Sequence, residues 1–275
     1  MADALLPLDP FENRHSSAAD EAIRQDALDA DAPHTNQLEE YQDANVQKTL
    51  DNAYVPKPIL EARMLQDDWL TERFKGSKLR IADIGCGDGY HGEIFAPDCI
   101  AYDGYEISEA MTQKTNDRWV ANGLKNAHVT QCDAGSVPLK PDYYDVAWSL
   151  YFTSGNFRDE LKLEEYTDEY LDRNPKFIKI ISNFFKALKP EGRLLLTVYK
   201  DKPVTEEAQR TFYQKTGQTL VTPVGSRFVS TQENFWSVRW TKESMLSNLK
   251  ACGIEPDKVT FHDLNDVSWI VEIIK

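Results

Sequence analysis

The sequence predicts an α/β fold in which a mostly parallel sheet carries helices on both faces and ends in an antiparallel hairpin. Segments with the composition of buried strands alternate with helical segments from residue 79 to residue 199, and this alternation requires parallel strands joined by helical crossovers. A glycine-rich loop, IGCGDG, follows the first strand segment. Two further strand segments near the C-terminus are separated by Asn265 and Asp266, which predicts a hairpin.

Residues 1–55 are interpreted as an N-terminal extension. This stretch is acidic, rich in alanine and free of glycine. Tyr41 and Tyr54 are large side chains in its otherwise polar C-terminal half. We therefore expect a helical lid over the pocket of the remaining domain, residues 56–275, and we assign Tyr54 to the substrate side. A partly ordered tail is the alternative interpretation.

The domain is expected to begin with a helix over residues 56–74, which Pro56 and Pro58 introduce. A helix should open at the glycine loop, and two more should follow later strands, the first with Ser108 as its N-cap. The expected strands of the parallel part are residues 79–84, 100–105, 127–132, 144–152 and 192–199. The later helices are expected over residues 108–124 and 174–192.

After the last of these strands the chain changes character. Residues 200–240 are polar and aromatic, and we interpret them as an irregular insertion on the substrate side. Thr241 is the expected N-cap of a helix over residues 241–254. Residues 258–264 and 267–274 are the expected strands of the terminal hairpin.

Composition argues against several classes of function. The 275 residues include 31 Lys and Arg against 45 Asp and Glu, a formal net charge of -14. The resulting field repels a phosphate backbone, so no nucleic-acid partner is expected. No apolar run reaches the length of a membrane span and no secretory signal is recognised, so we expect no membrane association and a cytoplasmic location. Four scattered cysteines and five histidines without ligand spacing predict free thiols and no metal.

The segment IADIGCGDGYHG, residues 81–92, contains two overlapping glycine patterns. Gly85, Gly87 and Gly89 form G-x-G-x-G, whereas residues 87–92 also read G-x-G-x-x-G, the dinucleotide pattern. Ligands of open parallel sheets bind beyond the carboxyl ends of the strands, where this loop is expected to lie. Glycine there allows positive φ angles and lets the backbone touch the ligand.

Acidic residues favour S-adenosylmethionine over a dinucleotide at this loop. A dinucleotide brings a pyrophosphate to the helix N-terminus, whereas S-adenosylmethionine brings a cationic sulfonium and no phosphate. Asp83 and Asp88 flank or enter the loop, and their carboxylates suit the cation. Glu106, about 20 residues after the first glycine, is placed to accept both ribose hydroxyls in either kind of site. Asp133 follows the third strand, where an adenine amino group could donate to it.

These motifs together resemble the class I S-adenosylmethionine-dependent methyltransferases. The resemblance is carried by IADIGCGDG, YDGYEISEAM, VTQCDAGSVPL, YYDVAWSLYF and ALKPEGRLLLTVY, and by the ending at 241–275. It implies S-adenosylmethionine as the cofactor and a seven-stranded sheet of order 3-2-1-4-5-7-6 with an antiparallel strand seven. The cofactor residues it implies are Asp83, Gly85, Cys86, Gly87, Gly89, Glu106, Ile107, Asp133, Ala134 and Ser149. Gly92 is then a helix residue, and His91 is interpreted as a packing residue.

The acceptor pocket is expected over the end of the fourth strand, where the sequence reads SLYFTSGNFRDE. We assign Tyr151, Asn156 and Arg158 to positioning the acceptor. An N-P-P-Y type motif is absent, which argues against the DNA and glutamine branches of the family. TSGNF faintly resembles a segment of the histidine Nα-methyltransferases, although the glycine loop differs. Whether a general base is used stays open, because a thioether acceptor needs none.

Within the insertion, aromatic rings alternate with arginines in SRFVSTQENFWSVRW. Trp236 and Arg239 are assigned to the substrate, because aromatic faces attract cations and arginine binds carboxylates. The prediction is a small-molecule acceptor such as an amino acid or carboxylated metabolite. The alternatives are a protein or tRNA methyltransferase, a non-catalytic nucleoside-binding module and a nicotinamide oxidoreductase. Core or dimer contact is the other interpretation of the aromatic residues, and a homodimer stays open.

Overall fold

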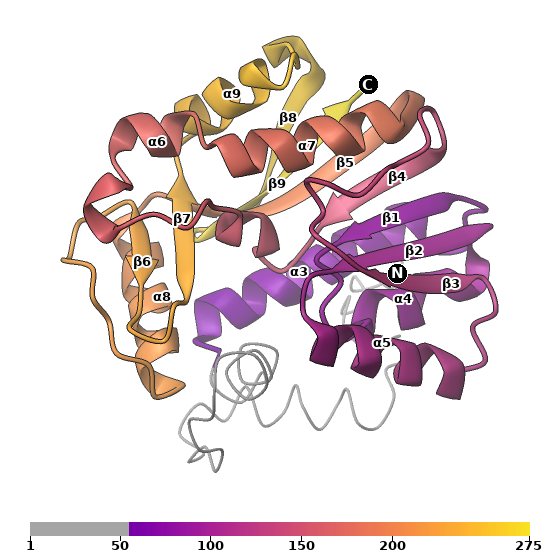
Figure 1. The fold of residues 1–275 in the computed structure, drawn as a ribbon, viewed down its shortest axis with the longest axis horizontal. Coiled ribbons are helices and arrows are strands. Elements are labelled where there is room, and N and C mark those ends of the chain that lie inside the picture. The colour runs from indigo at the N-terminus through magenta and orange to yellow at the C-terminus, as the bar shows by residue number, and fades with distance from the viewer. Residues whose placement is uncertain (1–54) are drawn as a thin grey trace, which may run out of the picture.

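The computed structural model describes residues 55–275. In its parallel sheet, strands alternate with helices as expected except between the third and fourth strands, which a loop connects (Figure 1). The parallel strands are β1 (Arg80–Ile84), β2 (Ala101–Glu106), β3 (Ala127–Gln131), β4 (Tyr144–Ser149) and β5 (Leu188–Lys200). They lie in the order β3-β2-β1-β4-β5. Strand β1 therefore has β2 on one side and β4 on the other, so the loop that follows β1 lies where the strand order reverses.

The terminal hairpin completes the sheet on the far side of β5. Strand β9 (Ser268–Ile274) runs antiparallel to β5, and β8 (Val259–Asn265) runs antiparallel to β9. The Asn265 side chain closes the turn by accepting a 3.1 Å hydrogen bond from the Val267 amide. With β9 as strand seven and β8 as strand six, the order is the expected 3-2-1-4-5-7-6, and the predicted fold class is confirmed.

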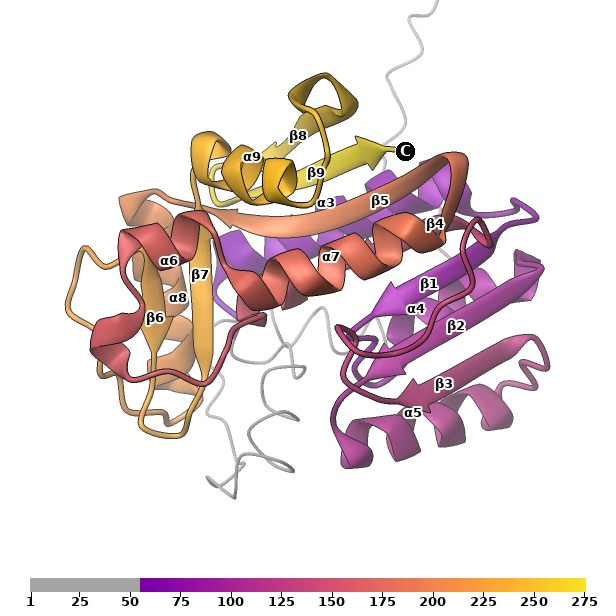
Figure 2. The same ribbon diagram turned by 45° about the horizontal axis from the view of Figure 1, so that its top comes forward.

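Helices cover both faces of the sheet, and α3 and α7 lie on opposite sides of β5 (Figure 2). One face is covered by α3 (Lys57–Phe74), α4 (Tyr90–Phe95) and α5 (Glu109–Ala121), and the other by α7 (Pro175–Ala187) and α9 (Lys242–Ala251). Consecutive strand residues point to opposite faces. Ile81 and Val146 accordingly pack with α3, α4 and α5, while their neighbours Ala82 and Ala147 pack with α7 and α9.

Both predicted N-caps are confirmed by hydrogen bonds. The Ser108 hydroxyl accepts from the Met111 amide at 3.3 Å, and the Thr241 hydroxyl accepts from the Ser244 amide at 3.1 Å. Each bond satisfies one of the free amides at the start of a helix.

Several predicted boundaries were wrong, among them the start of β5, which begins at Leu188 and not at residue 192. Helix α7 ends at Ala187 and not at residue 192, because Leu188 already pairs with Tyr144 of β4 and Pro190 has no amide proton to continue a helix. Strand β4 ends at Ser149 and not at residue 152.

The insertion, residues 200–240, is not irregular as predicted. It contains helix α8 (Pro203–Lys215) and two short antiparallel strands, β6 (Phe228–Ser230) and β7 (Trp236–Trp240). The first residue of α8 is a proline, a common helix start, which the sequence analysis passed over. The short helices of the domain are α6 (Asp168–Asp172), η3 (Ala96–Asp98), η4 (Thr153–Asn156), η5 (Leu163–Glu165) and η6 (Pro256–Lys258).

Strand β7 extends the sheet beyond the end of β4. The Lys200 amide donates to the Val267 carbonyl next to β9, and the next amide, of Asp201, donates to the Trp240 carbonyl of β7. Successive amides of an extended strand point to opposite edges, so β7 lies on the edge of β5 that β4 also uses. The insertion thereby borders the carboxyl end of β4.

The predicted lid lies outside the described residues except for Val55, and Tyr54 lies outside them as well. Within residues 55–275, no helix combines the length and the apolar character that crossing a membrane requires.

Candidate functional site

The loop after β1 depends on three glycines in the left-handed backbone region. The φ angles of Gly85, Gly87 and Gly89 are 71°, 58° and 82°. Residues with a Cβ rarely adopt such angles. The loop is fastened to β2 through the Gly85 amide, which donates a 2.7 Å hydrogen bond to the Tyr105 carbonyl. Each glycine of the G-x-G-x-G pattern is therefore needed for its positive φ angle.

Gly85 and Gly89 also have side chains of neighbouring elements close to their Cα atoms. A Cβ on Gly85 would overlap the Thr153 methyl group, and one on Gly89 would lie 2.7 Å from the Trp119 indole nitrogen. Gly92 lies in α4, as the resemblance implied, and a Cβ there would also overlap Trp119. Gly92, the last glycine of the overlapping G-x-G-x-x-G match, is thus required by the packing of α4 against Trp119.

Helix α5 supports the loop through two side chains one turn apart. Thr115 donates a 2.6 Å hydrogen bond to the Gly87 carbonyl, and the Trp119 indole donates a 2.8 Å bond to the Gly89 carbonyl. This role is not apparent from the local sequence. The i, i+4 spacing places both on one face of the helix, but spacing does not show which carbonyls they reach.

Glu106 is fixed at the end of β2 next to the loop. One carboxylate oxygen accepts from the Gly87 amide, and the other accepts from the Ile107 and Ser108 amides, all at 2.9 Å. Glu106 is 8% exposed, and burial raises its pKa while these amide hydrogen bonds oppose the rise. The carboxylate is thereby oriented before any ligand arrives.

Asp83 is buried beneath the loop at the end of β1. It accepts a 2.6 Å hydrogen bond from the Tyr102 hydroxyl, and burial raises its pKa. Asp88, in contrast, pairs with Arg118 at 3.2 Å. The charge of Asp88 is therefore compensated within the protein.

Cys86 fills the space below the loop. Burial, followed by the nearby charges of Asp83 and Glu106, raises the pKa of its thiol well above the usual value. The thiol stays protonated near neutral pH. Because a Cβ on Gly104 would lie 2.7 Å from the Cys86 sulfur, this pair is a close packing contact between the loop and β2.

The predicted adenine side follows β2 and β3. Ile107 exposes 69% of its surface next to Glu106. The Asp133 carboxylate accepts from the Gly135 amide at 2.9 Å and from Lys176 of α7 at 2.6 Å. Burial raises the Asp133 pKa, but these hydrogen bonds outweigh it and lower the pKa overall. The neighbouring Ala134 carbonyl accepts from Asn183 at 3.1 Å.

The end of β4 contains buried hydroxyls with unused hydrogen-bonding capacity. Within residues 55–275, the hydroxyl oxygens of Ser149 and Ser154 have no hydrogen-bond partner. A buried polar group without a partner costs about 1–3 kcal/mol. An unpaired hydroxyl, an oriented carboxylate and a glycine cradle fit a ligand that carries both a ribose and an amino-acid end.

The chain turns sharply after β4. Tyr151 and Phe152 have φ angles of 49° and 67°, a strained conformation for two consecutive residues with side chains. The Phe152 ring stacks on Tyr199 of β5, with centroids 3.7 Å apart and planes 5° apart. The Tyr151 hydroxyl donates a 2.6 Å hydrogen bond to Asp67 of α3. Strain of this kind is characteristic of functional sites.

Two of the residues assigned to the acceptor side lie together. Arg158 donates to the Asn234 carbonyl at 2.8 Å, and its guanidinium lies 5.7 Å from the Trp236 ring centroid. Trp236 itself is 1% exposed. Asn156, in η4, is exposed.

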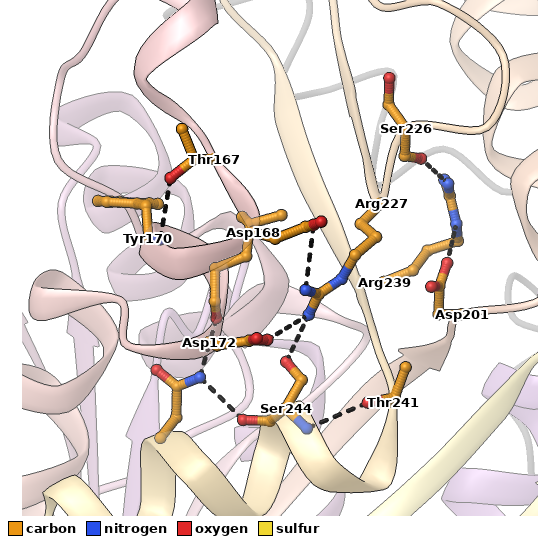
Figure 3. A network of polar contacts seen from close by, with 12 residues as sticks. Thr167, Asp168, Tyr170, Asp172, Asp201, Ser226, Arg227, Arg239, Thr241 and Ser244 are labelled. Atoms are coloured by element: carbon orange, nitrogen blue, oxygen red, sulfur yellow. Dashed lines mark hydrogen bonds and ion pairs between the residues drawn. The ribbon is translucent and has the colours of Figure 1, made fainter.

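Arg239 is enclosed by protein groups (Figure 3). It donates to Asp201 at 3.2 Å and to the Ser226 carbonyl, as Figure 3 shows. It also donates to Gln209 at 2.9 Å. Arg227 forms a second network with Asp168, Asp172 and Ser244, which ties the insertion to α6 and α9. Arg227 therefore ties the insertion to neighbouring helices, whereas the hydrogen-bond partners of Arg239 lie within the insertion itself.

The comparisons with known proteins agree with this geometry. A family model described as "Methyltransferase domain" matches residues 75–242. The ubiquinone biosynthesis O-methyltransferase of Pseudomonas fluorescens is 22% identical over 148 residues, 54% of this chain and 56% of that protein. The ubiquinone/menaquinone biosynthesis C-methyltransferase of Vibrio parahaemolyticus is 28% identical over 138 residues, 48% of this chain and 46% of that protein.

A solved structure shares the fold. The Burkholderia thailandensis 1,6-didemethyltoxoflavin-N1-methyltransferase, with bound 1,6-didemethyltoxoflavin and S-adenosylhomocysteine, matches with a TM-score of 0.51 and 13% identity. The match covers 89% of this chain and 94% of that one. The chain spans about half the length of the curated relatives it matches. From the family match over residues 75–242 and the strand order together, the chain belongs to the class I S-adenosylmethionine-dependent methyltransferases.

Proposed function

We propose that the chain transfers the methyl group of S-adenosylmethionine to a small-molecule acceptor bound over the end of β4. The observation that carries the proposal is the cradle of Gly85, Gly87 and Gly89, closed on one side by the fixed carboxylate of Glu106. When bound, the sulfonium supplies a methyl carbon with a good leaving group. The residues of the chain then have mainly to hold and align the two reactants.

The residues present divide the work of holding the cofactor. Glu106 would accept the ribose hydroxyls, because both of its oxygens are already oriented by backbone amides. Asp83 and the loop would hold the methionine end. Ile107 would cover the adenine, and Asp133 with Ala134 would bind its edge.

Support for a small acceptor comes from charge and from the border of the site. A net charge of -14 does not favour a polyanionic substrate. The insertion, residues 200–240, lies against the end of β4, where a Cβ on Gly155 of η4 would lie 3.3 Å from the Val238 carbonyl. We therefore propose that the insertion forms the substrate side. We also propose that residues 1–55, with Tyr54, form a lid.

For an acidic acceptor, partly exposed Arg158 is better supported than Arg239. Arg158 lies near the Trp236 ring with part of its surface accessible, whereas Arg239 is 1% exposed and bonded to protein groups. The ubiquinone-related names of the curated relatives also support a small organic acceptor.

Calorimetry and methyl labelling test this function. We expect the full chain to bind S-adenosylhomocysteine and not NADH, and to transfer labelled methyl to the low-molecular-weight fraction of a cell extract. Labelling confined to protein or RNA would contradict the small-molecule proposal. Cofactor binding without any transfer would identify a nucleoside-binding module, and binding of NADH alone would identify an oxidoreductase.

A further inference from the structure

A buried polar cluster lies behind Tyr151, at the side of the glycine loop where α3 and α4 meet. Asp67 of α3 and His91 of α4 are each 6% exposed, and the Asp67 Oδ1 atom lies 3.1 Å from His91 Nε2. The other carboxylate oxygen accepts the hydroxyl of Tyr151 at 2.6 Å. The sequence analysis expected a packing role for His91 and did not single out Asp67, although Arg63, Gln66 and Asp67 form a polar i, i+3, i+4 stripe on their helix.

Gln66 has a fixed amide orientation in this cluster. Its Oε1 atom receives the Tyr151 backbone amide at 3.0 Å and the Thr197 hydroxyl at 2.5 Å. A backbone amide can only donate, so the oxygen of the Gln66 amide must lie on that side. The Nε2 group therefore faces Asp67 Oδ1 at 3.0 Å and His91 Nε2 at 3.3 Å. Gln66 then uses all four of its hydrogen-bonding positions.

In the tautomer whose Nε2 carries no proton, His91 accepts a hydrogen bond from the Gln66 Nε2 group. Asp67 Oδ1 then presents a second lone pair 3.1 Å from His91 Nε2. Two acceptors at hydrogen-bond distance, held there by one amide that donates to both, form a site for one additional proton. Taking up that proton converts an acceptor-to-acceptor contact into a charge-assisted hydrogen bond.

Tyr151 connects this proton site to the end of β4. Burial, followed by the charge of Asp67, raises the pKa of the Tyr151 phenol well above its usual value, so the phenol keeps its proton near neutral pH. Tyr151 is partly exposed, whereas Asp67 and His91 are almost enclosed. Its ring is held by His91, with centroids 4.7 Å apart. Tyr151 is thus the outer member of the chain of groups.

We propose that Tyr151, Asp67 and His91 form a proton relay, and that the acceptor is a weakly acidic hydroxyl compound, a phenol or enol, that loses a proton as it is methylated. This inference rests on the proposed methyl transfer. The acceptor oxygen bonds to the methyl carbon while the carbon–sulfur bond breaks and leaves its electron pair on sulfur. The hydroxyl proton passes to the Tyr151 oxygen and the Tyr151 proton passes to Asp67, which leaves the Asp67–His91 pair holding one additional proton. Tyr151 is the catalytic residue, and Asp67 and His91 are positioning residues that act through it.

The charged groups around the relay act in opposite directions: the Arg63 cation opposes uptake of a proton, and the carboxylates favour it. The Arg63 guanidinium lies 4.9 Å from the Tyr151 ring centroid. The Tyr90 hydroxyl lies 3.4 Å from Asp67 Oδ2. Asp83 of β1 is close enough to His91 for a favourable charge interaction. Two carboxylates, Asp67 and Asp83, therefore face an imidazolium that forms at His91.

The test uses 4-nitrophenol, whose phenolate is yellow, with the full chain saturated with S-adenosylhomocysteine. We expect bound 4-nitrophenol to show a phenolate-to-phenol ratio about tenfold above that in buffer at the same pH, which corresponds to about one pKa unit. His91→Gln and Tyr151→Phe should each abolish the increase. His128→Gln, which changes an exposed histidine of β3, is the matched control and should keep it.

The outcomes separate this inference from the proposed function. No increase with the wild-type chain, or a full increase with His91→Gln, overturns the relay. Failure to bind S-adenosylhomocysteine would instead defeat the proposed methyl transfer. The S-adenosylhomocysteine affinities of both variants should stay close to the wild-type value, and cooperative thermal unfolding should show that both variants are folded. A folded variant that binds S-adenosylhomocysteine normally but loses the phenolate band cannot be explained by a structural role. If one variant does not fold, the other variant carries the test, and absence of the increase in the wild type overturns the relay in any case.

Discussion

The indole nitrogen of Trp119 donates a 2.8 Å hydrogen bond to the carbonyl oxygen of Gly89, so α5 holds the end of the loop that follows β1. The preceding turn of the same helix adds the bond from Thr115 to the Gly87 carbonyl. A loop of glycines has a large conformational entropy when unfolded. Two side-chain donors from one rigid helix offset part of that cost and give the loop a single shape before the cofactor binds.

Trp119→Phe should destabilise the protein by about 1–3 kcal/mol, because it leaves the buried Gly89 carbonyl without its donor. Loss of the larger indole ring adds to the effect. Thr115→Val, which keeps the shape and removes the other donor, is the matched variant and should cost about 1 kcal/mol. Urea unfolding measures both. Equal stability of Trp119→Phe and the wild type would show that the indole bond is not important for the loop.

Gly85→Ala should destabilise the chain more than Gly76→Ala. Both glycines have positive φ angles, 71° and 81°, which cost a residue with a Cβ about 1–2 kcal/mol. A Cβ at Gly76 meets nothing within 4 Å, whereas one at Gly85 overlaps the Thr153 methyl group.

Adding Thr153→Ser to Gly85→Ala removes that methyl group and should recover part of the stability. Thermal unfolding of the single and double variants separates backbone strain from overlap. If Gly76→Ala proved as damaging as Gly85→Ala, the close approach of Thr153 would have no energetic importance.

Asp83→Ala and Glu106→Ala should each weaken binding of S-adenosylhomocysteine by about 1–3 kcal/mol. Each substitution leaves hydrogen-bond donors of the bound cofactor buried without an acceptor. This range corresponds to a loss of about five- to 150-fold in affinity. Glu109→Ala changes an exposed acid at the start of α5 and should bind normally. Calorimetry provides the constants. Unchanged affinity in either test variant would show that the cofactor lies elsewhere.

Glu272 should make the protein sensitive to acid. Burial raises its pKa, but the 2.8 Å contact with His262 and the ion pair with Arg193 outweigh this and lower the pKa overall. A carboxylate with a lowered folded-state pKa stabilises the protein above its unfolded pKa of about 4.3, and this contribution is lost as the pH falls through the lower folded value.

Glu272→Gln removes this contribution and is the control for acid sensitivity. The stability difference between the wild type and Glu272→Gln should be constant near neutral pH and should shrink below about pH 4.3. Urea unfolding at a series of pH values measures the difference. A difference that grows as the solution becomes more acidic would reverse the assigned sign.

Local sequence determined much of this protein. The three glycines of the loop, the caps at Ser108 and Thr241, and the order of strands and helices follow from backbone sterics and from hydrogen bonds between near neighbours. Such effects act within a few residues, so they are visible in a sequence that has not yet folded. The parallel sheet follows in turn, because alternating strands and helices have few other ways to bury their apolar faces.

The tertiary structure alone decided where the long-range polar contacts form. Asp67 meets His91 from 24 positions away and Tyr151 from 84. No local pattern carries the pairing, because it depends on which helix packs beside which strand. The same reason explains Arg239, assigned to the substrate from its aromatic surroundings: packing of α8 against β7 encloses it among Gln209, Asp201 and Ser226. Contacts between distant segments are decided by the packing of whole elements, which single residues do not reveal.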